Sequence, residues 1–162
     1  MSCEIRAARF SDIPEIRRLM DLALASSKFA GRVHIDRNAL RRVAMDLISG
    51  QTEAPQCNGR VIVAEKSGGG LSALFVGFVQ PLYACLDVSV ASDLIWFAEP
   101  GSGARASLGV LDAFIDWADS ADHPVLHRYA ITDAITNPDA IGALLTRRHG
   151  FGLVGGLYEK GL

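Results

Sequence analysis

Hydrophobic positions along the chain follow two periods, and each change of period marks a predicted element. Some stretches repeat apolar residues every three or four positions, which predicts helices with one buried face. Others alternate, or run together over several residues between turn-forming glycines and prolines, which predicts strands. Helices are predicted from Asp12 to about Ser26, from Asp36 to Ser49, over 108–118 and from Asn137 to Gly150, and strands over 3–10, 60–66, 71–80, 86–98, 123–132 and, as one or two short strands, 151–160.

Short signals at the element ends support these assignments. Asp12-Ile-Pro-Glu15 combines a capping aspartate, a proline in the first turn and a glutamate three residues later, which is typical of a helix start. Asn137-Pro138 is a second such start, and the glycines of 67–70 join two strands into a hairpin. The element order predicts an α+β fold: a central mixed sheet of six to seven strands with about four helices, antiparallel first and then joined by helical crossovers.

Composition restricts the class of protein. The 162 residues are 49% hydrophobic and 21% charged, which predicts one folded domain over 1–162 and excludes a disordered chain. No apolar run approaches the roughly 20 residues of a membrane span, and MSCEIRAARF lacks the apolar stretch of a signal peptide. Cys3, Cys57 and Cys85 are widely spaced, so neither a disulfide framework nor a metal site is predicted. We therefore expect a soluble cytoplasmic protein.

Charge is unevenly spread between the two parts of the chain. The net charge of −2 argues against a nucleic-acid partner. Residues 1–60 carry ten Lys/Arg against seven Asp/Glu, whereas residues 61–162 carry six against eleven. Such a pattern is typical of a solvated helix face, and the functional alternative is a basic wall that attracts an acidic substrate or cofactor. Most of the basic excess comes from Lys28, Arg32, Arg37, Arg41 and Arg42.

The loop GSGARAS, residues 101–107, is unusually small between a predicted strand and helix. Ligands commonly bind at the carboxyl ends of strands, and the free N–H groups of a helix start favour an anion. Arg105 adds a cation able to contact phosphate at two points. The loop matches neither GxGxxG nor a Walker motif. Since a tight strand-to-helix turn also needs glycine, a phosphate loop and a plain turn are both open.

The chain resembles the GNAT acyltransferase superfamily over nearly its whole length. The likeness lies in the element order, in the strand–proline–loop–helix segment 92–118, and in the ending NPDAIGALLTRRHGFGLVGGLYEK. It looks most similar to small bacterial and phage members with a WF-x-x-P strand end and a terminal LY-x-K. The resemblance implies a mostly antiparallel GNAT-like sheet. It also implies an acetyltransferase in which an amine of a small molecule or peptide directly attacks acetyl-CoA.

The same resemblance implies roles for individual residues. Asp93, seven positions before Pro100, is the implied general base, with Asp87 and Glu99 as weaker alternatives. Thr146 stands where the family carries a tyrosine acid. The loop would bind the pyrophosphate, the strand end would pair with the pantetheine arm, and Asn137 would lie near that arm. The implied cofactor-binding residues are Ile95, Trp96, Phe97, Ala98, Gly101, Ser102, Gly103, Ala104, Arg105, Ala106, Ser107 and Asn137, and the predicted acceptor-binding residues are Lys28, Arg32 and Arg37.

Two departures from the family pattern keep other functions open. The first loop position, usually Gln or Arg, falls on Gly103 or Ser102 according to the alignment, and the tyrosine is replaced by Thr146. The alternatives are a GNAT-like binding protein with little catalysis, with or without CoA, and a domain that binds nucleotide phosphates. Many family members are dimers, and the apolar strands at 71–79 and 86–98 allow a homodimer.

A cysteine–histidine site is the remaining candidate chemistry. Cys57 or Cys85 would act as nucleophile with His123, His127 or His149 as base, but no spacing supports such a pair. His127 is therefore interpreted as a residue of an alternating strand.

Overall fold

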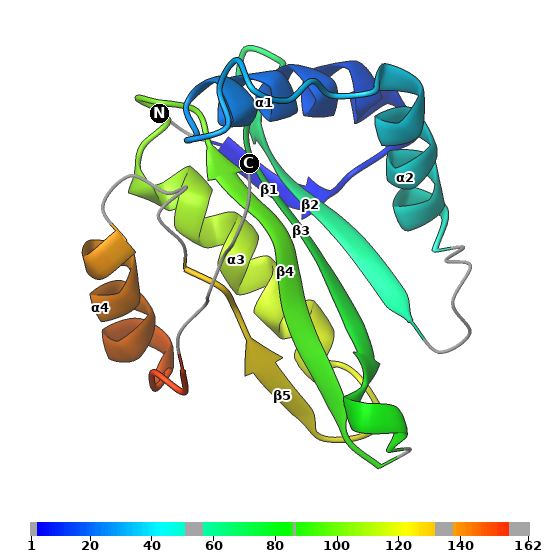
Figure 1. Cartoon of the computed structure of the whole chain (residues 1–162), viewed down its shortest axis with the longest axis vertical. Helices are drawn as coiled ribbons and strands as arrows, with labels where there is room; N and C mark the ends of the chain where they lie inside the picture. Colours follow the sequence, from blue (N-terminus) through cyan, green and yellow to red (C-terminus); the bar gives the residue numbers. More distant parts are fainter. Residues whose placement is uncertain (1–2, 51–56, 86, 132–137, 156–162) are drawn as a thin grey trace.

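The computed structural model describes residues 3–50, 57–85, 87–131 and 138–155, which form a five-stranded sheet with helices on both faces (Figure 1). The strands lie in the order β1-β2-β3-β4-β5, and only β4 and β5 are parallel. The elements are β1 Cys3–Ala7, η1 Phe10–Asp12, α1 Ile13–Ala25, α2 Arg37–Ser49, β2 Asn58–Lys66, β3 Leu71–Pro81, η2 Leu82–Ala84, β4 Ser89–Ala98, α3 Ala104–Asp119, β5 Val125–Arg128 and α4 Pro138–His149.

Each face of the sheet has its own core. On one face α1 and α2 bury Leu19 and Leu47 against β2 and β3. On the other face α3 and α4 cover the sheet, and Phe114 of α3 stacks on Phe75 with ring centroids 4.5 Å apart. Because β3 is covered on both sides, Leu71–Pro81 reads as a nearly continuous apolar run instead of an alternating one.

The predicted α+β architecture and its four helices are confirmed, with a smaller strand count. The described part of the chain contains five strands where six to seven were predicted. Residues 151–155, predicted to open a last strand, have no regular structure, and the rest of that prediction lies outside the described residues. The fifth strand covers only Val125–Arg128 of the predicted 123–132. Among the described residues, no helix combines the length and apolar character that crossing a membrane requires.

The first helix begins directly after Asp12, as predicted, but the predicted capping by the Asp12 side chain is wrong. The Asp12 side chain makes no capping hydrogen bond to α1. It accepts two hydrogen bonds from the Arg6 guanidinium, at 2.7 and 2.9 Å, and one from the Arg9 N–H. This two-point ion pair with a strand residue displaces the local cap. Asp36, in contrast, caps α2 by accepting from the N–H groups of Asn38 and Ala39.

The β4 strand changes register against β3 halfway along its length, and its pairing with β5 ends early. Val76 of β3 pairs with Ile95 but Gly77 pairs with Asp93, so Leu94 is an extra, bulged residue. The parallel ladder to β5 has only four pairs, from Ser89–Val125 to Ser92–Arg128. Figure 1 shows β4 continuing beyond the end of β5. We call this divergence, bounded by Asp93 on β4 and by Tyr129 after β5, the fork.

Candidate functional site

The loop after β4 begins with a tight turn that requires glycine. The Glu99 carbonyl accepts from the Ser102 N–H at 3.0 Å, and Gly101 has a φ of +84° at the third position, as in a type II turn. Gly103, with φ +82° and ψ 156°, lies in a region that only glycine occupies readily. Backbone conformation therefore accounts for both glycines. The outer side of the loop is open, since a Cβ at either position would meet nothing within 4 Å.

The helix that follows presents an uncapped N-terminus. Gly103 provides no side-chain cap, and the first turn of α3 contains no acidic residue. Its positive dipole end and its free N–H groups therefore suit an anion, beside the exposed Arg105. Ala106 is fully buried in the core, so only its backbone can face a ligand. Trp96 points toward α3, and its indole N–H donates to the Ser107 carbonyl at 3.0 Å, which fixes the first turn against β4.

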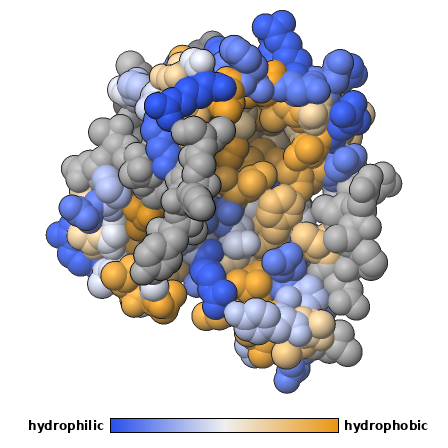
Figure 2. Space-filling view, in the orientation of Figure 1, coloured by the Kyte–Doolittle hydropathy of each residue, from blue (hydrophilic) through white to orange (hydrophobic). Residues whose placement is uncertain are grey.

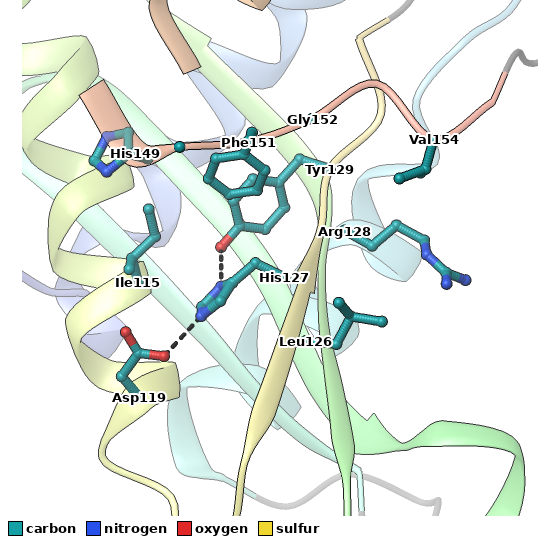
Figure 3. Close-up of a pocket in the computed structure, with 11 residues that line it drawn as sticks. Ile115, Asp119, Leu126, His127, Arg128, Tyr129, His149, Phe151, Gly152 and Val154 are labelled. Carbon is teal, nitrogen blue, oxygen red and sulfur yellow. Dashed lines mark hydrogen bonds and ion pairs between the residues drawn. The ribbon is translucent and has the colours of Figure 1, made fainter. Parts of the chain in front are cut away.

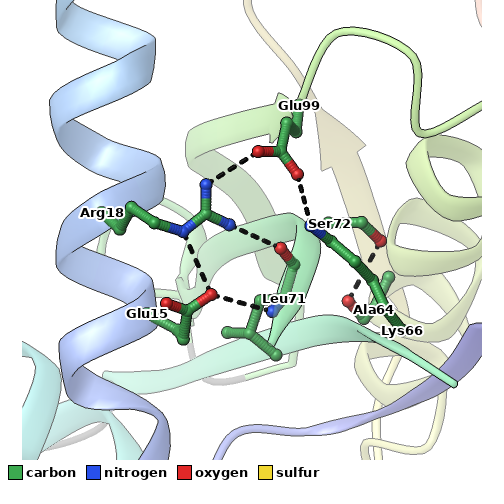
Figure 4. A network of polar contacts seen from close by, with 7 residues as sticks. All are labelled: Glu15, Arg18, Ala64, Lys66, Leu71, Ser72 and Glu99. Atoms are coloured by element: carbon green, nitrogen blue, oxygen red, sulfur yellow. Dashed lines mark hydrogen bonds and ion pairs between the residues drawn. The ribbon is translucent and has the colours of Figure 1, made fainter. Parts of the chain in front are cut away.

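A polar network anchors the start of this loop (Figure 4). Glu99 accepts from Arg18 at 2.8 Å and from Lys66 at 2.7 Å, and Arg18 also donates to the Leu71 carbonyl at 2.7 Å. The hydrogen bond from Lys66 and the pairing with Arg18 hold the pKa of Glu99 below its usual range. Glu99 is therefore a structural anion and a weak base. The other alternative base, Asp87, is exposed before the first residue of β4.

Asp93 lies at the fork on the α3 face of the sheet. Its partner Gly77 faces α3, where a Cβ would lie 2.5 Å from the Phe114 ring. The Asp93 carboxylate accepts from the Ala130 N–H at 2.9 Å, across the gap where β4 and β5 separate. Burial raises the pKa of Asp93, and the hydrogen bond from Ala130 offsets part of that shift. A carboxylate with a raised pKa is a stronger proton acceptor at neutral pH.

The structure places the predicted acceptor-binding residues on the other face. Lys28 and Arg32 are exposed on the segment between α1 and α2, and Arg37 is the exposed first residue of α2. That face is hollowed and apolar beneath α1 (Figure 2), and Ile95 and Phe97 of β4 pack there. The three basic residues and the Asp93 side chain therefore lie on opposite faces of the sheet.

The remaining predicted residues lie on or near α4. Thr146 is exposed in the last turns of that helix, whose end at Gly150 has the expected left-handed φ of +72°. Asn137, the predicted contact to the pantetheine arm, lies outside the described residues.

A second polar cluster was missed by the sequence reasoning. His127 contacts Asp119 at 2.7 Å and the Tyr129 hydroxyl at 2.8 Å, and all three side chains line a pocket of about 470 Å³ (Figure 3). The alternation of His127 and Tyr129 along one strand indicated a shared face. Nothing local indicated that the end of α3 would bring Asp119 to that face.

Comparison with known proteins identifies the fold. No protein-family model matches the chain, and no curated protein matches its sequence. An aminoglycoside acetyltransferase from an uncultured soil metagenomic sample matches at 13% identity and a TM-score of 0.69, covering 99% of this chain and 96% of that chain. A ribosomal-protein-alanine N-acetyltransferase from Brucella melitensis matches at 12% identity and a TM-score of 0.69, covering 99% and 100%.

A glucosamine-6-phosphate N-acetyltransferase from Arabidopsis thaliana matches at 11% identity and a TM-score of 0.65, covering 99% of this chain and 98% of that chain. At such identities the likeness shows the fold, and it covers 96% or more of each of these chains. The chain therefore has the GNAT acetyltransferase fold, and the resemblance predicted from the sequence is confirmed at that level.

Proposed function

We propose that the protein is an N-acyltransferase that moves an acetyl group from acetyl-CoA to the amine of a small molecule or peptide. The observation that carries this proposal is the fork. There a strand leaves its neighbour beside a half-buried acid, and it leads into an open glycine loop and an uncapped helix. By their names, the similar structures act on an aminoglycoside, a sugar phosphate and a ribosomal protein, so the fold is compatible with several acceptor classes.

The residues of this loop and strand end fit the proposed donor. The backbone N–H groups of 101–107 and the Arg105 side chain would hold the pyrophosphate at the dipole of α3. The main chain of Ile95–Ala98 extends past β5, and no described strand pairs with it on that side, so it would be available to an amide-containing arm. When bound, acetyl-CoA supplies the activated acyl group. The chain's own part is to orient that group, to polarise its carbonyl with backbone N–H groups of β4, and to take up a proton.

Asp93 is the base in this proposal. Its carboxylate would accept the proton that the attacking amine loses as the C–N bond forms and the C–S bond breaks. Thr146 is a poor proton donor to the departing sulfur. A thiol with a pKa of about 8.5 leaves largely as the thiolate, so a dedicated acid is not essential.

The exposed Thr146 favours a second candidate, a protein of this fold that binds a CoA thioester with little turnover. A single variant, Asp93→Asn, distinguishes the two functions. Asp93→Asn should abolish turnover in an enzyme while donor binding persists, whereas a binding protein has no turnover to lose. A domain for nucleotide phosphates, the third alternative, would bind ATP as tightly as CoA.

Titration calorimetry with acetyl-CoA, CoA and ATP tests the donor site. The informative variant is Ala104→Asp, at the exposed first residue of α3, with Ala104→Asn as the uncharged control. An aspartate there stabilises a helix by about 0.3–1 kcal/mol through the dipole, so the variant should stay folded. It should weaken acetyl-CoA binding about tenfold or more, because like charges about 4 Å apart repel by about 4 kcal/mol near a surface.

The asparagine control should bind within about threefold of the wild type, a difference of under 1 kcal/mol. Equal affinity of both variants for acetyl-CoA would exclude phosphate binding at this loop. Absence of any saturable binding by folded wild-type protein would overturn the proposed function itself.

A further inference from the structure

Three hydrogen-bonded side chains beside the fork have no part in the function proposed so far. Tyr129 follows β5, His127 lies within it, and Asp119 is the last residue of α3. The His127 ring joins the other two, with Nδ1 2.8 Å from the Tyr129 hydroxyl and Nε2 2.7 Å from Asp119 Oδ1. Figure 3 shows this continuous chain along one wall of the pocket of about 470 Å³.

Donor and acceptor chemistry fixes the direction of these hydrogen bonds when the His127 ring is neutral. An ionised carboxylate can only accept, so the Nε2 of His127 must carry a hydrogen to bond Asp119. In the neutral ring Nδ1 is then an acceptor, and the Tyr129 hydroxyl must donate to it. Both hydrogens therefore point from Tyr129 toward Asp119.

The two ends of the chain lie in different surroundings. Tyr129 packs among aromatic rings, with centroids 5.7 Å from Phe75 and 5.2 Å from Phe151. The Asp119 side chain is 58% exposed, and that of His127 is 16% exposed. The three hydrogen-bonded side chains thus connect the interior of the α3 face with solvent.

The residue at the inner end, Tyr129, occupies the backbone position beside the proposed base. Ser92 pairs with Arg128, so Asp93 and Tyr129 follow at neighbouring positions, and the Ala130 N–H still reaches the Asp93 carboxylate. Burial, followed by the negative charges of Asp93 and Asp119, raises the pKa of Tyr129 well above its usual value. The phenol therefore keeps its proton, and it can pass one outward only while it receives another.

We propose that Tyr129, His127 and Asp119 form a proton-transfer chain that carries the proton collected by Asp93 from the fork to solvent. The inference rests on the proposed function. Protonated Asp93 gives its proton to the Tyr129 oxygen, directly or across one water, as the phenolic hydrogen moves to Nδ1. The Nε2 hydrogen passes to Asp119, which releases it to water. The ring then takes up a proton from water at Nε2 and loses its Nδ1 hydrogen to pocket solvent, which restores the starting tautomer. One proton enters and one leaves.

Kinetic tests use variants that preserve packing. Tyr129→Phe keeps the ring and removes the hydroxyl, and His127→Gln interrupts the chain in the middle. The matched control is His123→Gln, because His123 bonds Ser89 Oγ at 2.6 Å, outside the chain. The assay follows CoA release from acetyl-CoA with three acceptors: an aminoglycoside, glucosamine 6-phosphate and an alanine-ended peptide.

Both variants of the proton-transfer chain should lower kcat about 10- to 100-fold, less than the roughly 100- to 10,000-fold of a direct acid–base group, with acetyl-CoA affinity unchanged. They should also raise the solvent deuterium isotope effect on kcat, which lost packing alone would not do. The control should match the wild type. Wild-type kcat and isotope effect in Tyr129→Phe would overturn the proton-transfer chain while leaving the acyltransferase proposal intact.

A second measurement needs no acceptor. Long-range ¹H–¹⁵N spectra at pH 8, with His127 assigned from His127→Gln, should show the Nε2–H tautomer and a Nδ1 shift that changes in Tyr129→Phe. A Nδ1–H ring, or a spectrum that is unaffected by Tyr129→Phe, would overturn the chain even if no acceptor is turned over.

Discussion

Asp12 and Asp93 lie near opposite edges of the same sheet, in opposite electrostatic surroundings. Asp12, beside the edge strand β1, meets the Arg6 guanidinium at two points, and this pairing holds the pKa of its carboxyl below the usual range. Asp93, at the fork, receives a hydrogen bond from the Ala130 N–H, and burial raises its pKa. The first arrangement stabilises an ionised acid, and the second destabilises one.

The contrast extends to the backbone around each acid. β1 and β2 pair along the whole of β1, and the Glu65 carboxylate of β2 also accepts from Arg6 at 2.7 Å. At the fork, β4 bulges at Leu94 and then loses its neighbour β5. The ion pairs of Arg6 at β1 thus stabilise the fold, whereas the fork contains an acid whose ionisation opposes folding. A carboxyl group whose pKa is raised by burial, at a point where two strands separate, is a candidate for a functional site.

The largest effect is expected at the fork, from Asp93→Asn. If Asp93 is the base, kcat should fall about 100-fold or more, with acetyl-CoA affinity unchanged. The free energy of unfolding should rise at pH 7, because the variant keeps an acceptor for Ala130 and removes a buried charge. Since the folded pKa is raised, the ionised acid destabilises the wild type once the pH exceeds the unfolded value. The gain should therefore be smaller at pH 5 than at pH 8, by urea denaturation.

Asp116→Asn is the matched control, because Asp116 is exposed on α3. It should leave both kcat and the free energy of unfolding close to wild type. If Asp93→Asn instead lowers stability at neutral pH and keeps kcat, Asp93 is a structural residue and the contrast with Asp12 disappears.

The second largest effect is expected at Asp12, and it is a loss of stability. Asp12→Asn should lower the free energy of unfolding by about 2 kcal/mol, the scale of charged hydrogen bonds, and should leave acetyl-CoA binding unchanged. The Arg6 side chain, only 11% exposed, keeps Glu65 as its partner, which limits the loss. The folded pKa of Asp12 is lowered, so its stabilisation is present above the unfolded value near 3.9 and is lost as the pH falls through the folded pKa.

Urea denaturation from pH 7 to pH 3 measures both quantities. The difference between wild type and Asp12→Asn should shrink toward pH 3. A constant difference over that range would show that lost packing, and not the ion pair, accounts for the effect.

The same two regions show why the sequence predicted some features and missed others. The helices and the β2–β3 hairpin follow from local periodicity and turn glycines, so their prediction succeeded. The cap at Asp12 failed because Arg6, a residue of another element, competes for the carboxylate. The early end of β5 at Arg128 depends on where β4 bulges, which no alternating pattern in 123–132 reveals.

For the candidate site, the sequence was most informative about the loop. Its glycines have the positive φ values that a tight turn requires, and their outer side is open to a ligand. The structure is therefore compatible with both interpretations of GSGARAS, as a phosphate-binding loop and as a plain turn. Asp93 was singled out by resemblance alone, and its role stays a prediction. The hydrogen-bonded chain through His127 was not predicted, because it depends on the tertiary contact between the end of α3 and β5.

The smallest effect is expected from the basic residues on the α1–α2 side. If an anionic acceptor approaches the fork from that face, Arg32→Glu and Arg37→Glu should each raise its KM up to about fivefold, since exposed ion pairs contribute about 0.2–1 kcal/mol. The value of kcat should be unchanged, and added salt should reduce the difference. Arg147→Glu on α4 makes the same charge change on the opposite face and serves as control. An equal rise of KM in all three variants would indicate net charge as the cause, and no rise in any would place the acceptor elsewhere.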